Sequence, residues 1–249
     1  MKQLFLVPAC LVVSLTSCDR NEEENSSHWT DIARVYPEAL AQFSFSCDLS
    51  NVPADSRYFT GKINGSEVCY VEGDKEYQMY SGYDRRWLSG STIPPNYDTY
   101  TETSAYLFGM YSDIETVERL DFIMPGSPEF TNAQRIVESS LRLGELPLAS
   151  NEKSQLQGYT VEITFLFEPE DTTYQRSFYW IKLTSAFGEQ EGGRLAVTQL
   201  NKVETDTTIL YDLTIELDCK LYWQRSDEEM AYFGDLVDGV FKTSIVVDK

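Results

Sequence analysis

The sequence predicts a mainly β protein, an antiparallel β-sandwich or half-open barrel with one docked α-helix. Three observations lead to this prediction: stretches in which apolar and polar residues alternate, tight-turn motifs between such stretches, and one amphipathic segment near the middle of the chain. Alternation with a period of two places apolar side chains on one face of a strand. Many such strands at short spacing, each with one half-polar face, indicate packed antiparallel layers.

The clearest alternation lies in residues 209–223, where every second residue from Ile209 to Trp223 is apolar. The intervening residues are mostly polar, so one face of this strand is expected to be buried and the other exposed to solvent. At about 3.4 Å per residue the strand would reach roughly 50 Å, well beyond the usual length. We therefore expect a bulge, or a bend between two sheets, partway along it.

Further strands are expected where the same pattern recurs. Clear alternations occupy 43–49, 161–167 and 241–247, and weaker candidates are 106–110, 120–124, 177–183 and 195–203.

Two glycine motifs predict tight turns between these strands. Asn64-Gly65 separates "YFTGKI" from "SEVCYV" and suits a type I′ hairpin, because both central positions of that turn need positive φ. Gly192-Gly193 predicts a second tight turn. Antiparallel hairpins are therefore expected to dominate.

One segment has a helical period instead. Thr131 followed by Gln134 has the form of a capping box, and Gly144 offers a C-terminal stop. The apolar stripe of this segment consists of Ala133, Ile136, Val137, Leu141 and Leu143. A helix of about eleven residues is marginal alone, so it is expected to dock on a sheet. Residues 30–41 are expected to make another short helical turn.

Residues 1–17 are predicted to be a signal peptide, because a short basic start precedes an apolar run that is too short to span a ~30 Å hydrocarbon core. Leu15-Thr16-Ser17-Cys18 resembles the lipobox of bacterial lipoproteins. The resemblance implies that Cys18 is acylated and becomes the first mature residue. Two or more acyl chains would attach the protein stably to a membrane.

The acidic stretch from Asp19 to Glu24 is similar to the export signal of Bacteroidota-type lipoproteins, which implies the outer face of the outer membrane. An aspartate directly after the cysteine would instead mean inner-membrane retention under enterobacterial rules. We favour the surface because the acidity continues to Glu24. Residues 18–29 then form a lipidated acidic tether, and 30–249 a β-rich globular domain with a possible seam near 151–158.

A wider resemblance joins these motifs. The lipobox, the "FTGKINGSEV" hairpin, the capped helix ending at Gly144 and the closing "LTIELDCKLY" and "DGVFKTSIV" strands resemble a group of Bacteroidota lipoproteins of unassigned function. The resemblance spans most of the mature chain and implies a β-rich envelope domain. It supplies no catalytic residues.

Charge and motifs exclude several classes of function. With 20 Lys and Arg against 40 Asp and Glu, the net charge is −20, which repels nucleic acid. We expect this acidity to keep the protein soluble rather than to recruit a cationic partner. No dinucleotide-binding or phosphate-cradling motif occurs, so neither a nucleotide nor any cofactor is expected.

The residues for histidine or thiolate chemistry are also missing. His28 is the only histidine and lies in the tether, which argues against histidine-based catalysis and metal sites. No CxxC motif occurs, and loop carboxylates such as Asp235 and Asp238 are better explained as solvated charges than as calcium ligands, so no metal is expected. Cys47, Cys69 and Cys219 allow three disulfide pairings, with burial as small apolar residues as the alternative.

Aromatic residues supply the candidate ligand-binding site. Six of them lie close together in the sequence among amides, carboxylates and hydroxyls: Tyr77, Tyr80, Tyr83, Trp87, Tyr97 and Tyr100. Flat rings and polar groups of this kind suit a carbohydrate. The alternative is that these residues are ordinary strand formers half-buried on a sheet.

We therefore expect a non-catalytic surface lipoprotein that recognises a glycan or an envelope protein. A structural or assembly subunit that pairs through an edge strand is the alternative. A histidine-independent glycoside hydrolase is the third possibility, because Glu216 and Asp218 share one strand face roughly 7 Å apart. No catalytic residue is assigned.

Overall fold

The computed structural model describes residues 52–53, 55–73, 78–89, 100–112, 118–126, 132–150, 157–167, 179–224 and 230–249. For 83–89, 100–104, 118, 166–167, 179–180 and 224 it describes the backbone only. The expected strand at 43–49 and helical turn at 30–41 lie outside these ranges.

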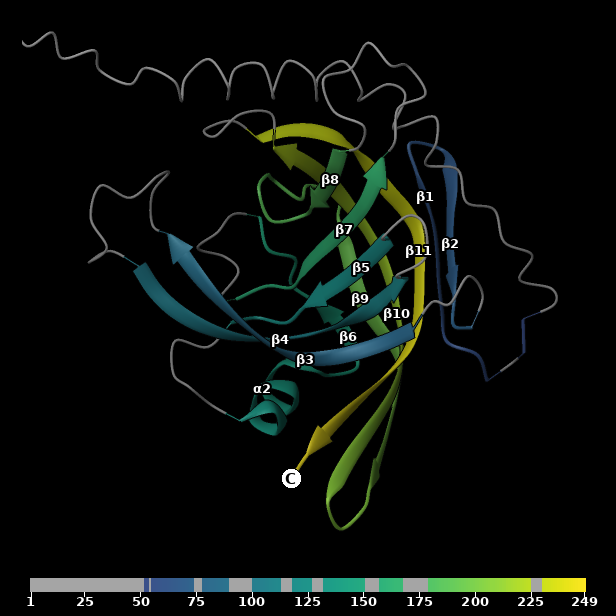
Figure 1. Cartoon of the computed structure of the whole chain (residues 1–249), viewed down its shortest axis with the longest axis vertical. Helices are drawn as coiled ribbons and strands as arrows, with labels where there is room; N and C mark the ends of the chain where they lie inside the picture. Colours follow the sequence, from purple (N-terminus) through teal and green to yellow (C-terminus); the bar gives the residue numbers. More distant parts are fainter. Residues whose placement is uncertain are drawn as a thin grey trace, which may run out of the picture.

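The described residues form strands and one helix (Figure 1). In chain order these elements are β1 (Tyr58–Ile63), β2 (Ser66–Val71), β3 (Gln78–Ser89), β4 (Tyr100–Ser112), β5 (Glu118–Ile123), α2 (Ala133–Ser140), β6 (Gly144–Leu146), β7 (Thr160–Phe167), β8 (Tyr179–Thr184), β9 (Arg194–Glu204), β10 (Thr208–Gln224) and β11 (Met230–Asp248).

The strands form one antiparallel sheet. Its hydrogen-bonded order is β2-β1-β11-β10-β8-β7-β5-β4-β3, and β9 joins β10 and β6 beside this path. In the described part of the chain, the path ends at β2 on one side and β3 on the other, so the sheet is not closed into a barrel. The predicted mainly β, antiparallel architecture with one helix is therefore confirmed. None of the described helical residues forms a helix of the length and apolarity needed to cross a bilayer.

Four phenylalanines hold the two halves of the sheet against each other. Phe241 of β11 stacks on Phe122 of β5 with ring centroids 4.8 Å apart, and on Phe108 of β4 at 6.2 Å. Phe59 of β1 meets Phe241 edge-on at 6.1 Å. All four side chains are fully buried. This aromatic cluster packs β4 and β5 against β1 and β11.

β10 follows its sequence pattern closely. Its odd-numbered side chains from Ile209 to Trp223 are buried, as the alternation predicts. Its first part pairs with β9, whereas Tyr222 and Trp223 pair with β8. Its register against β11 also shifts between Leu217 and Cys219. Of the two expected alternatives, the structure shows an irregular register partway along this strand, although the extra residue lies on the partner strand β11.

The bulge belongs to β11 and is held by charged side chains from both neighbouring strands. Asp238 has a φ of 55°. Its backbone N–H donates to the Asp218 carboxylate at 2.8 Å, and its own carboxylate accepts from Lys62 at 3.0 Å. Gly239 follows, and a Cβ there would lie 2.6 Å from the carbonyl oxygen of Leu217. A larger residue would therefore push the two strands apart.

The predicted turns are present. Asn64 and Gly65 have φ values of 52° and 83° and connect β1 to β2, as a type I′ turn requires. Gly192 has a φ of 78°, and the N–H of Gly193 donates to the carbonyl of Gln190 at 2.9 Å, which closes the turn before β9.

The helix differs from its prediction at both ends. Its N-cap is Asn132, whose side chain accepts from the N–H of Arg135 at 2.9 Å, and Gln134 bonds to Glu138 instead of completing a capping box. Helix α2 has eight residues and ends at Ser140. Leu143, expected on the apolar stripe, is 60% exposed because the chain has left the helix before it.

The aromatic cluster makes Phe241 the residue on which the fold depends most. We expect Phe241→Ala to lower the free energy of unfolding by about 3–5 kcal/mol, because it leaves a cavity between three rings. Urea unfolding measures this. Val246→Ala, on the same strand but 51% exposed, is the matched control and should change the value by less than about 0.5 kcal/mol. Equal effects of the two substitutions would contradict the assignment.

Candidate functional site

The structure places the predicted aromatic residues only in part. Tyr77 and Tyr97 lie outside the described residues. Tyr83 and Trp87 lie on β3 and Tyr100 on β4, with backbone only described. β3 pairs with β4 without a register shift, so the alternation of the strand places Tyr83 and Trp87 on one face and Tyr80 on the other.

Tyr80 is engaged within the protein. The Tyr80 side chain is half-buried, and its hydroxyl accepts a hydrogen bond from Nε of Arg119 at 2.8 Å. The Arg119 guanidinium lies 4.9 Å from its ring centroid, and Tyr111 meets it edge-on at 5.5 Å. These contacts favour a packing role for Tyr80.

Next to Tyr80 lies a buried pair of carboxylates. Asp121 of β5 and Glu162 of β7 are direct cross-strand partners, and each is 5% exposed. Arg119 bonds to Asp121 at 2.7 Å, and Lys182 bonds to Glu162 at 2.8 Å. The second carboxylate oxygen of Asp121, Oδ1, has no partner. Burial, reinforced by the charge of Glu162, raises the pKa of Asp121 to about 7, and Lys182 opposes this shift.

Two adjacent carboxyls, one of them with a raised pKa, resemble the acid–base pairs of glycoside hydrolases. Such enzymes need both carboxyls to reach a sugar, whereas Asp121 and Glu162 are buried and each is paired with a cation. Glu216 and Asp218, the pair on β10, are also engaged: Arg194 lies 3.5 Å from Glu216, and Asp218 accepts the bulge N–H. Both pairs favour structural roles.

An open polar groove lies on the outer face of β9, β10 and β11. It has a volume of about 560 Å³. Strand pairing builds its floor as two rows, in which Thr214 lies between Gln199 and Lys242, and Asp212 between Asn201 and Ser244. Arg57, just before β1, completes the polar wall.

Hydrogen bonds fix one wall of the groove. Arg57 Nε donates to Ser244 Oγ at 2.8 Å, its NH1 bonds to Glu72 at 3.1 Å, and Ser244 Oγ donates to Asp212. On the other wall, Gln199 Oε1 accepts from the Thr214 hydroxyl at 3.3 Å. No hydrogen bond within the described residues engages the amide NH₂ of Gln199, so it can bind a ligand.

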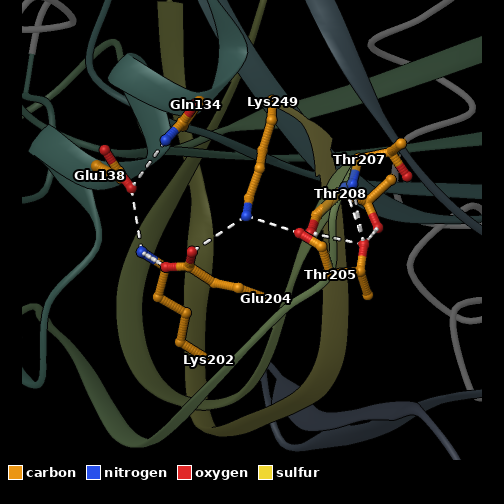
Figure 2. Close-up of polar contacts among 8 residues, drawn as sticks. All are labelled: Gln134, Glu138, Lys202, Glu204, Thr205, Thr207, Thr208 and Lys249. Atoms are coloured by element: carbon orange, nitrogen blue, oxygen red, sulfur yellow. Dashed lines mark hydrogen bonds and ion pairs between the residues drawn. The ribbon is translucent and has the colours of Figure 1, made fainter.

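An ion-pair network supports the hairpin of β9 and β10, which projects from the body beside α2 (Figures 1 and 2). Lys202 bonds to Glu138 of α2 at 3.1 Å and to Glu204 at 2.7 Å. Lys249 reaches Glu204 at 3.2 Å and the carbonyl of Thr205 at 2.6 Å. The bonds from Lys202 and Lys249 lower the pKa of Glu204. Exposed pairs stabilise little individually, and together these contacts connect the end of β9 to α2 and to Lys249.

Sequence reasoning missed an aromatic pair at the other end of β10. Tyr222 and Tyr232 are direct cross-strand partners, with ring centroids 5.9 Å apart and planes at 68°. Tyr232 is 52% exposed. The sequence contained a signal for this pair, because Tyr222 is an aromatic residue at one of the alternate β10 positions that are otherwise mostly polar and face outward.

The cysteines differ in state. Cys69 is disulfide-bonded, whereas Cys219 is a buried free thiol whose pKa is raised by burial. The two pairings that involve Cys219 are therefore excluded, and Cys219 is the small buried residue that its alternation predicts. Cys47 lies outside the described residues. Over the described ranges, no three metal-binding side chains of His, Cys, Asp or Glu come together.

Comparison with known proteins gives no further guide to this site, since no family model, no curated protein and no solved structure matches the chain.

The buried carboxylate pair predicts an unusual dependence of stability on pH. Because the pKa of Asp121 rises from 3.8 to about 7 on folding, the folded state keeps a proton that the unfolded state loses. The contribution of Asp121 is therefore most favourable below pH 3.8 and is lost as the pH rises through about 7. We expect Asp121→Asn to become more stable relative to wild type by roughly 1–3 kcal/mol between pH 4.5 and 8.

Urea unfolding across that pH range measures the difference. Glu162→Gln is the companion variant, and it should weaken the pH dependence because it removes the neighbouring negative charge. A difference between Asp121→Asn and wild type that stays constant with pH would refute the assignment.

Proposed function

We propose that the protein is a lipid-anchored, surface-exposed lipoprotein that binds a glycan without catalysing a reaction. The outer-face groove is the observation that carries this proposal. Its walls offer amides, hydroxyls, carboxylates and cations within one open depression of about 560 Å³. Sugars present many hydroxyls, each of which donates and accepts, so a surface that mixes donors and acceptors complements them.

The rigidity of the groove favours recognition. Its polar groups stand on three paired strands, and Arg57, Ser244 and Asp212 are already hydrogen-bonded to one another. Side chains held in place lose little conformational entropy when a ligand binds. Asn201 is exposed, and no hydrogen bond within the described residues engages its side chain, so its amide is free to bind a ligand.

The disulfide at Cys69 supports a location outside the cytoplasm, because disulfides persist in oxidising compartments. Together with the lipobox at Cys18 and the acidic residues after it, this favours anchoring on the exterior of a Bacteroidota-type outer membrane. The net charge of −20 would keep such a protein away from anionic lipid heads.

An assembly role is the second candidate. Val203 and Val246 are 46% and 51% exposed, and both pair with Leu210 across the projecting hairpin. β6 covers only residues 195–197 of the outer edge of β9. An envelope protein could pair with this edge. We rank it second because three apolar residues are few against the roughly 20–30 residues that each partner contributes to a stable interface.

Removing the free amides of the groove tests the glycan proposal. We expect the double variant Gln199→Ala, Asn201→Ala to lose at least about tenfold in affinity for the oligosaccharide that wild type binds best, a loss of about 1.4 kcal/mol. Titration calorimetry with malto-, cello-, xylo- and manno-hexaose provides the measurement. Thr198→Ala, an exposed neighbour outside the groove, should bind like wild type.

The same titration separates the groove from the aromatic segment that the sequence predicts as the ligand site. If Trp87→Ala with Tyr97→Ala abolishes binding and the groove variant does not, the ligand lies on the aromatic segment instead. If no glycan from a broad panel binds wild type, the proposed function is wrong.

The anchor has its own test. Cys18→Ala should release the protein from the membrane fraction and abolish incorporation of labelled fatty acid, because the thiol that would be acylated is gone. Cys219→Ala, which removes a buried free thiol, is the control and should leave both unchanged. Membrane attachment that persists without Cys18 would contradict the lipoprotein assignment.

A further inference from the structure

We propose that Tyr222 and Tyr232 form a second sugar contact, an aromatic corner on the same sheet face as the groove but at the other end of β10. The inference rests on the proposed function, because it takes the ligand to be a glycan. The corner would supply an apolar surface for one face of a sugar ring, and the polar groove offers no aromatic surface of this kind.

The geometry of the two rings suits a pyranose. They are cross-strand partners whose planes meet at 68°, so one ring can cover the C–H face of a sugar while the other bounds its side. Tyr232 is 52% exposed, which leaves most of its ring accessible. Tyrosine combines a large contact area with few rotatable bonds, which limits the entropy lost on binding.

Tyr222 is held firmly in its place. Its hydroxyl donates to the carbonyl of Glu189 at 3.0 Å. A Cβ at Gly188 would lie 2.0 Å from the Tyr222 ring, so a larger residue there would have to displace the ring. Gly188 and Glu189 therefore both contact the Tyr222 side chain.

Gln190 ties that loop to the strand. Its amide NH₂ donates to the carbonyls of Ser185 at 2.7 Å and Lys220 at 2.9 Å, and its Oε1 accepts from the Lys220 N–H at 2.8 Å. A corner fixed in this way needs little reorganisation to bind.

Polar groups for the sugar hydroxyls lie beside the rings. Lys220 and Asp235 are cross-strand partners in the neighbouring row of β10 and β11, and Asp235 is exposed. Burial raises the pKa of Tyr232 to about 12, and a hydrogen bond to the adjacent Asp235 carboxylate adds to the shift, so the Tyr232 hydroxyl is held by Asp235. The corner thus joins an apolar ring face to a carboxylate and an ammonium group.

The spacing of the two contacts defines the ligand further. Eight residues separate Thr214 in the groove from Tyr222, which corresponds to at most roughly 27 Å along the strand. A mono- or disaccharide occupies one contact at a time, whereas an extended chain engages both. A ligand that engages both contacts at once binds more tightly than one that engages either contact alone, because the second contact forms within the same complex. The structure therefore favours an extended, unbranched oligosaccharide.

Substitution of the exposed ring tests the corner. With the hexaose that wild type binds best, we expect Tyr232→Ala to weaken binding at least about tenfold and Tyr232→Phe less than about threefold, because stacking needs the ring and not the hydroxyl. Tyr111→Ala removes a ring from the other half of the sheet and should bind like wild type. Circular dichroism and thermal unfolding verify that each variant is folded.

The outcomes separate this proposal from the function on which it rests. If Tyr232→Ala binds like wild type while the Gln199 and Asn201 double variant does not, the corner is refuted and the groove stands. If Tyr232→Phe loses as much as Tyr232→Ala, or if Tyr111→Ala also loses binding, stacking at the corner is refuted. If wild type binds none of the hexaoses, both the corner and the proposed function fall.

Discussion

The stacking of Phe241 against Phe108 and Phe122 is the contact on which the rest of the structure depends. A single antiparallel sheet this wide would otherwise leave one apolar face in water. By bringing β4 and β5 onto β11, the aromatic cluster buries that face and leaves the opposite face of β9, β10 and β11 to the solvent. The groove and the tyrosine corner both lie on this outer face, so the packing of the core decides where a ligand can bind.

The same alternation along β10 produces both the core and the candidate site. Its odd-numbered residues fill the interior, and its even-numbered residues Asp212, Thr214 and Tyr222 face outward. The bulge at Asp238 lets β11 follow β10 over its full length while β10 exchanges β9 for β8. Charged side chains hold that irregularity, so the acidic composition has a structural use besides solubility.

Local patterns were sufficient to predict β10, the Asn64-Gly65 turn and helix α2, because each depends on near neighbours. The N-cap was misplaced because Thr131 and Asn132 both have capping side chains, and only the backbone geometry identifies which one caps. The first half of β11 was missed because the bulge interrupts the alternation of the strand. Before the bulge the buried residue Leu236 has an even number, whereas after it the buried residues, from Gly239 and Phe241 onward, have odd numbers. The groove depends on strand register, which no local pattern contains.

The pairing of β1 with β11 also bears on how such a chain could be exported. Arg57 and Ser244 are 187 residues apart in the sequence, yet they are hydrogen-bonded in the folded protein. The β1–β2 hairpin therefore gains its sheet neighbour only when a strand far downstream is available, and contacts of such long range form slowly. If the protein is exported as we propose, slow closure keeps the chain unfolded for longer, which is the state that a secretory translocase requires.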